Sequence, residues 1–93
     1  MRTIELDAAT WRSVGDFYDA ILRAIGAPKA HGRSINALID SMALGGINEV
    51  AAPYTIRICN TAVLQNDVMS EMDSLRRELR EASREDVSLE IVA

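Results

Sequence analysis

Three short segments in which apolar and polar residues alternate constrain the fold of this chain more than any other feature. They cover residues 3–6, 54–59 and 88–92, and helical patterns fill the stretches between them. Strands that are separated by helices favour parallel pairing through right-handed crossovers. A parallel sheet covered on both faces shows continuous apolar runs, whereas these strands alternate. We therefore predict an α/β fold with two layers, in which a three-stranded parallel sheet carries helices mainly on one face.

The first two helical patterns lie between the first and second strands. Ser13 can cap the first helix, Gly26 fits the position just past its end, and Pro28 stops its continuation. The apolar residues of this helix fall within a narrow arc, namely Val14, Phe17, Tyr18, Ile21 and Ile25. A second helix is predicted from about residue 34 to residue 44, where Gly45-Gly46 ends it.

Two further helical patterns follow the second strand. Asn60 and Thr61 can cap a short helical turn. A long helix should start at Asp67 or at Ser70, where Ser70-x-x-Asp73 is a weak variant of the capping box. The predicted core side of this helix consists of Val68, Met72, Leu75, Leu79 and Ala82. Its remaining surface is rich in Arg and Glu, which is typical of a solvated helix face.

The composition predicts one globular domain over residues 1–93 with a net negative charge. Apolar residues make up 48% of the chain and charged residues 26%, and the formal net charge is −4. A chain of this length can bury a core without disulfides or a metal ion. An acidic surface repels the phosphates of nucleic acids and membranes and attracts basic partners. We therefore expect a free monomer that binds a basic protein and contacts neither nucleic acid nor membrane directly.

The cysteine and histidine counts exclude several kinds of site. Cys59 is the only cysteine and His31 the only histidine, so the chain can form neither an internal disulfide nor a multi-histidine metal site. The N-terminal residues lack the apolar run of a signal peptide, and no segment is long enough to span a bilayer. We expect a cytoplasmic protein that uses no metal and no cofactor.

The segment from Pro28 to Asp40 carries the strongest functional signal. A Pro-Lys-Ala-His-Gly loop leads into the second helix, where Asn36 and Asp40, spaced i and i+4, share one face. A different face of that helix is apolar and contains Ile35, Leu38, Ile39 and Met42. The apolar face can enter a core while the other presents a small polar surface with one carboxylate. Since no catalytic motif accompanies this pattern, it predicts a protein that binds rather than reacts.

A small enzyme that uses His31 and Asp40 is the rival interpretation of the same segment. One histidine, without a nucleophile motif or a cofactor fingerprint, leaves no complete catalytic site. A lone carboxylate on a helix surface is in most cases simply solvated, so Asp40 by itself carries little weight. The sequence therefore predicts a protein that is not an enzyme.

Several motifs, taken together, resemble those of one protein family. They are Arg12-Ser13-x-x-Asp16, Ala27-Pro28, His31-Gly32-x-x-Ile35-Asn36-Ala37-Leu38-x-Asp40, Pro53 with the strand after it, and Arg80-Glu81-Ala82. In these motifs the chain resembles the barstar family, whose members are intracellular inhibitors of the extracellular ribonuclease barnase. The resemblance covers most of the chain, although residues 44–53 align poorly and are longer here. It implies a three-stranded parallel sheet with helices, in agreement with the pattern of alternation.

The resemblance also implies which residues bind a partner. Asp40 matches the central acidic residue of the family's interface, and Glu81 matches an acidic contact from the long helix. The positions around the loop that match interface residues are Ala30, His31, Gly32, Ser34 and Asn36. Arg33 completes the predicted surface, with a positive charge where the family has a negative one.

The chain also departs from the family at this surface. Ala30-His31 stand where the family has two tyrosines, Asn36 replaces an acid, and Ile39 replaces a tryptophan. We therefore predict an inhibitor or immunity protein that blocks the active site of a microbial ribonuclease or related nuclease toxin through an acidic loop-helix surface. An extracellular or delivered toxin with a less cationic cleft than barnase fits these departures. The alternative is a barstar-like binding module with a regulatory partner that is not a nuclease.

Overall fold

The structure is a computed structural model that describes residues 2–44, 48–82 and 86–93. Its elements are, in chain order, β1 (Arg2–Asp7), α1 (Val14–Ala24), α2 (Ile35–Leu44), β2 (Tyr54–Cys59), the 3₁₀ helix η1 (Thr61–Val63), α3 (Asn66–Ala82) and β3 (Val87–Ile91). This order confirms the predicted α/β class. No helix within the described ranges is both long enough and apolar enough to cross a membrane.

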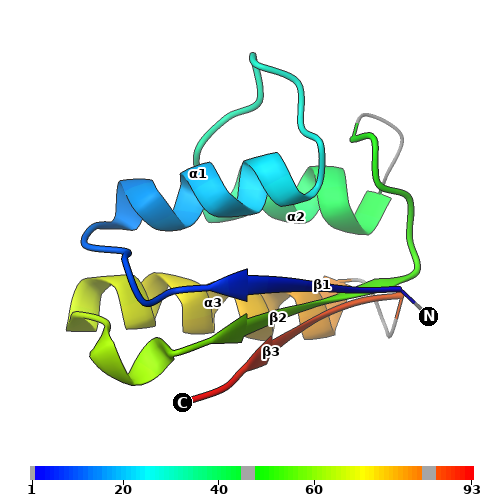
Figure 1. The fold of residues 1–93 in the computed structure, drawn as a ribbon. Coiled ribbons are helices and arrows are strands. Elements are labelled where there is room, and N and C mark those ends of the chain that lie inside the picture. The colour runs from blue at the N-terminus through cyan, green and yellow to red at the C-terminus, as the bar shows by residue number, and fades with distance from the viewer. Residues whose placement is uncertain (1, 45–47, 83–85) are drawn as a thin grey trace.

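The three strands form one parallel sheet in the order β1-β2-β3, as the sequence predicts. In register, Ile4 lies beside Ile56, which lies beside Leu89 on the other side. Figure 1 shows that α1, α2 and α3 all run in one direction, opposite to the strands. The N-terminal ends of the helices therefore lie near the C-terminal ends of the strands.

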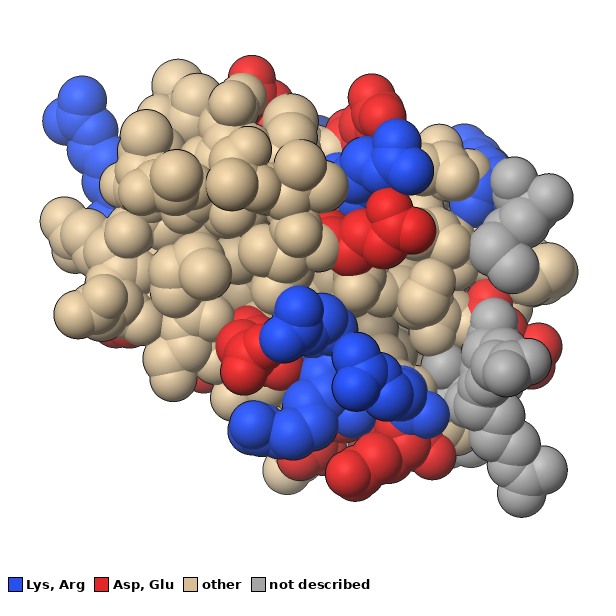
Figure 2. Space-filling model, turned by 90° about the horizontal axis from the view of Figure 1, so that it is seen from below, with Lys and Arg blue, Asp and Glu red and all other residues tan. Residues whose placement is uncertain are grey.

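The alternation in the strands divides the sheet into an apolar face and a polar one. Tyr54, Ile56 and Ile58 are buried. On the other face, the exposed side chain of Arg57 forms ion pairs with Glu5 at 3.3 Å and with Glu90 at 2.9 Å, so it bridges all three strands. Charges of both signs also adjoin one another on the side of the molecule that Figure 2 presents. The polar face explains why no strand reads as a continuous apolar run.

The core lies between the apolar face of the sheet and the helices. Its largest fully buried side chains are Tyr54, Phe17, Ile21, Ile25, Leu38, Met42, Ile56, Ile58, Met72, Leu75, Leu79 and Val68. Phe17 makes edge-to-face contacts with Trp11 and with Tyr18. On α3, the predicted core residues are buried except Ala82, which is exposed at the end of the helix.

The predicted ends of α1 are confirmed. The Ser13 side chain accepts a hydrogen bond from the Asp16 backbone N–H at 3.3 Å, which is an N-cap. Gly26 follows the helix with φ +66°, a left-handed conformation that favours glycine. A Cβ at Gly26 would also lie 2.6 Å from the Cβ of Glu49. The pair Gly45-Gly46, predicted to end α2, lies outside the described residues.

The predicted starts of the later helices were partly wrong. α3 begins at Asn66, one turn before Ser70, so Ser70-x-x-Asp73 lies inside the helix and is not a capping box. Asn60 precedes η1 in the left-handed region at φ 60° and makes no side-chain cap. Its amide instead donates to Asp7 at 2.8 Å, which links the end of β2 to the end of β1.

Candidate functional site

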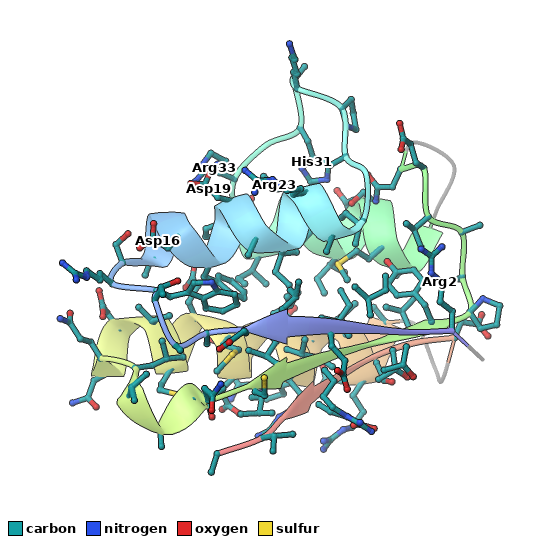
Figure 3. All side chains as sticks on the ribbon, viewed as in Figure 1. Arg2, Asp16, Asp19, Arg23, His31 and Arg33 are labelled. Atoms are coloured by element: carbon teal, nitrogen blue, oxygen red, sulfur yellow. The ribbon has the colours of Figure 1, made fainter. Side chains whose placement is uncertain are left out.

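The candidate site is built around residues 25–34, the α1–α2 loop, which rises above the helices in Figures 1 and 3. Because α1 and α2 run in the same direction, this loop must return along the length of α1. For an 11-residue helix that length is about 16 Å. The middle of the loop is a turn in which the His31 backbone N–H donates to the Pro28 carbonyl at 2.9 Å. Between these two residues, Lys29 and Ala30 are exposed.

The His31 side chain ties the loop to α2. Its Nδ1 lies 2.7 Å from the Gly32 carbonyl oxygen, and its Nε2 lies 2.7 Å from the Ser41 hydroxyl. Since a carbonyl only accepts, Nδ1 carries the proton of the bond to Gly32. Ser41 was not predicted, because a buried serine ten residues away in the sequence gives no signal of its own.

A serine hydroxyl 2.7 Å from a histidine nitrogen also occurs in catalytic serine–histidine pairs. The Ser41 side chain lies in the core with 3% exposure, and its hydroxyl also reaches the Leu38 carbonyl at 3.3 Å. A nucleophile must contact its substrate, and a buried hydroxyl cannot do so. Among the hydrogen bonds of the described residues, none joins His31 to Asp40. The geometry is that of a structural anchor for the loop.

Arg33 ties the other side of the loop to α1. One terminal nitrogen of its guanidinium forms an ion pair with Asp19 at 2.8 Å, and the other donates to the Gly15 carbonyl at 2.9 Å. The guanidinium carbon also lies 5.9 Å from the centre of the Tyr18 ring, within the range of a cation–π contact. Figure 3 shows Arg33 of the loop next to Asp19 of α1. The sequence predicted Arg33 as a surface residue but gave no indication of these contacts.

Gly32 and Ser34 determine how the loop enters α2. The Ser34 hydroxyl accepts from the Ala37 backbone N–H at 3.1 Å, which caps the first turn of the helix. A Cβ at Gly32 would lie 3.2 Å from the Cβ of Ala37, which is a tight contact. The small residue therefore lets the loop approach the helix closely.

Asn36 and Asp40 lie on the exposed side of α2, as the i and i+4 spacing predicts. Leu38 and Met42 on the same helix are buried, and Ile39 is half-buried. None of the ion pairs between described residues involves Asp40. The Asp40 carboxylate is therefore presented to solvent from a helix that is fixed by its apolar face.

Glu81 is exposed near the C-terminal end of α3. Because α2 packs against α3, Asp40 and Glu81 lie on neighbouring helices. The predicted surface includes Arg33, so it contains both signs of charge, and the exposed Lys29 lies on the same loop. Among the described residues, no group of three or more His, Cys, Asp or Glu side chains could hold a metal ion.

A comparison with protein families decides between the interpretations of this arrangement. The family model described as Barstar (barnase inhibitor) matches residues 1–92. The chain belongs to the barstar family. The match includes the α1–α2 loop, α2 and α3, and it continues through residues 44–53, where the motifs alone align poorly. A search of curated proteins finds no match.

Membership of this family identifies a barnase-inhibitor-like protein that works by contact with another protein, and the partner it implies is a ribonuclease. The barstar family is a family of inhibitors rather than of enzymes. The residues predicted to contact a partner lie on the α1–α2 loop, which His31 and Arg33 hold, and on α2 and α3. Contacts between these elements therefore fix their positions.

Proposed function

We propose that this member of the barstar family binds and blocks the active site of a microbial ribonuclease or related nuclease toxin. The α1–α2 loop and the exposed side of α2 form the contact surface, with Asp40 as its central anion and Glu81 as a flanking one. Ala30, His31, Gly32, Ser34 and Asn36 surround them, and Arg33 belongs to the same loop. The observation that carries the proposal is the exposed Asp40 carboxylate, which no described residue neutralises, within a chain matched by the barnase-inhibitor family.

The chemistry of Asp40 suits a nuclease inhibitor. A ribonuclease active site holds cations for the phosphate of RNA, and a carboxylate can accept charge-assisted hydrogen bonds from the same cations. A carboxylate has no bond that the enzyme can cleave. Because Asp40 stands on a helix with a buried face, little conformational entropy is lost when it binds.

The character of the surface favours a target other than barnase. Ala30 and His31 provide less aromatic area than the tyrosine pair of the family, and aromatic anchors often dominate interfaces. Lys29 is an exposed cation on the α1–α2 loop, and Arg33 is a cation where the family has a negative charge. An extracellular or delivered nuclease toxin with a less cationic cleft fits these features, and its inhibitor would act in the cytoplasm as a free monomer.

The test compares Asp40→Asn with Glu90→Gln in assays of ribonuclease inhibition. Both variants lose one carboxylate, but Glu90 lies on the polar face of the sheet, opposite the helices. The assays use a barnase-type ribonuclease and any nuclease encoded beside this protein, at low and at high salt. We expect inhibition that weakens with salt, is lost in Asp40→Asn and survives in Glu90→Gln. Equal inhibition by both variants would exclude Asp40 as the central anion.

A second candidate is a barstar-like binding module whose partner is not a nuclease. The observation in its favour is the pair of exposed cations, Lys29 and Arg33, at a surface that is acidic in the family. Affinity capture from the native cell decides between the two functions. Recovery of one stable stoichiometric complex that contains no nuclease would support the binding module, whereas recovery of a nuclease would support the inhibitor.

A further inference from the structure

We propose that Arg33 is a positioning residue, which acts on partner binding by holding the α1–α2 loop against α1 rather than by contacting the partner. This inference rests on the proposed function, because it assigns a role within that binding surface. The juxtaposition that carries it is the Arg33 guanidinium on Asp19, Gly15 and Tyr18 of α1.

The contacts of Arg33 fix its orientation. Its two terminal nitrogens are used on different acceptors, the Asp19 carboxylate at 2.8 Å and the Gly15 carbonyl at 2.9 Å. A planar guanidinium that is held at two points by a rigid fork cannot rotate freely, whereas a lysine ammonium offers no such fork. The position of the Tyr18 ring, 5.9 Å from the guanidinium carbon, favours the same placement.

The part of α1 that Arg33 contacts is itself fixed to the rest of the protein. Tyr18 is 4% exposed and donates a hydrogen bond to Glu71 of α3 at 2.5 Å. Its neighbour Phe17 is fully buried. A loop that is tied to this turn of α1 is therefore tied to the core and to α3.

Arg33 and His31 are two anchors on either side of Gly32. His31 reaches Ser41 of α2, and Arg33 reaches α1, so the loop is held from two helices. A loop that is ordered before binding loses less entropy when it binds. Both anchors leave Lys29 and Ala30 at the exposed turn available for contact.

The ion pair with Asp19 also accounts for the reversed charge at this position. A free cation at the partner-binding surface would oppose a cationic nuclease cleft, because like charges across an interface are unfavourable. Asp19 neutralises the guanidinium within the protein. The chain can therefore carry Arg33 where the family has a negative charge and still present Asp40 to a basic partner.

The first test needs only the free protein. Hydrogen exchange is measured at the His31 backbone N–H, which is bonded to the Pro28 carbonyl at 2.9 Å and reports on loop order. Arg33→Ala and Asp19→Ala should each raise this rate about twofold to fivefold, because an exposed ion pair stabilises the ordered loop modestly. Arg23→Ala is the matched control, because it removes an exposed cation from the last turn of α1, the helix that carries Asp19. Unchanged exchange in Arg33→Ala would overturn the proposal.

The second test is a double-mutant cycle that measures the affinity of the variants for the nuclease that the wild type inhibits. If Arg33 acts through Asp19, both single variants weaken binding by similar factors, and the double variant Arg33→Ala/Asp19→Ala is no weaker than Arg33→Ala alone. If Arg33 contacts the nuclease directly, the Asp19 substitution will not reproduce the loss and the effects will be additive, which would overturn the inference. Should the wild type inhibit no nuclease, the proposed function fails, while the exchange result still decides whether Arg33 holds the loop.

Discussion

Tyr18 on α1 and Glu71 on α3 are joined by a hydrogen bond of 2.5 Å between the phenol hydroxyl and the carboxylate. Tyr18 is buried, and the guanidinium of Arg33 stands 5.9 Å from its ring. The burial of Tyr18, together with the neighbouring Glu71 carboxylate, raises the pKa of its phenol. This single side chain therefore connects the part of α1 that holds the α1–α2 loop to α3, the helix that carries Glu81.

Replacement of Tyr18 by Phe should destabilise the protein. The change leaves the part-buried Glu71 carboxylate without its donor, and hydrogen bonds to charged groups contribute about 1.5–3 kcal/mol to the free energy of unfolding. Urea denaturation of Tyr18→Phe and of the wild type measures this difference. A variant as stable as the wild type would show that the contact makes no net contribution.

Replacement of Tyr54 by Phe should have the opposite effect. Tyr54 is 1% exposed, and its hydroxyl has no hydrogen-bond partner among the residues that the structure describes. A buried polar group without a partner opposes folding, so we expect Tyr54→Phe to be about 0–1 kcal/mol more stable than the wild type. The same urea titration compares the two tyrosine variants. A clear loss of stability in Tyr54→Phe would indicate that the hydroxyl is satisfied in solution, for example by a buried water molecule.

Stability should also fall as the pH rises above 10. Burial raises the pKa of Tyr54 from its ordinary value of 10.0 to about 12, and the pKa of Tyr18 is raised as well. Above pH 10 the unfolded chain releases these protons while the folded protein retains them, so the free energy of unfolding decreases. Urea midpoints measured between pH 8 and about pH 12 test this, and Tyr54→Phe should show a weaker decline. A pH-independent midpoint in the wild type would contradict the prediction.

Much of the fold could be predicted because it depends on local patterns. Each of these elements is buried on one side, and its own residues show this as a pattern. The pattern is the alternation in residues 54–59 and the apolar arc from Phe17 to Ile25. The start of α3 was harder, because several polar residues in succession can cap a helix. The structure begins it at Asn66, and the Met69 backbone N–H donates to the Gln65 carbonyl at 3.0 Å.

The candidate site was less predictable, because its anchors depend on the path of a loop. The exposure of Asp40 follows from helical spacing alone. The contact of Arg33 with Asp19 depends on α1 and α2 running in the same direction, so that the loop returns over α1. The contact of His31 with Ser41 depends on the same geometry. Spacing along the chain does not determine that path, so neither contact could be predicted.

The two glycines of the α1 region should respond differently to alanine. Gly26 has φ +66°, and an added Cβ would meet Glu49 at 2.6 Å, so Gly26→Ala should cost about 1–3 kcal/mol in stability. At Gly15, inside the helix, an added Cβ would lie 3.4 Å from the Ser13 hydroxyl. Gly15→Ala should therefore gain about 0.5–1 kcal/mol from helix propensity. Thermal denaturation of both variants provides the measurement, and equal effects of the two changes would contradict this account.

Ser41 should affect partner binding although it cannot touch a partner. Its side chain is 3% exposed, and its hydroxyl holds Nε2 of His31 at 2.7 Å. In Ser41→Ala the histidine loses its anchor on α2, so the α1–α2 loop occupies its bound conformation for a smaller fraction of the time. We expect inhibition of the target nuclease to weaken about fivefold to tenfold, because apparent affinity falls with the binding-competent fraction. The control is Ser70→Ala on the exposed side of α3, which should leave inhibition unchanged. If Ser41→Ala inhibited as well as the wild type, His31 would not need its anchor on α2 to present the loop.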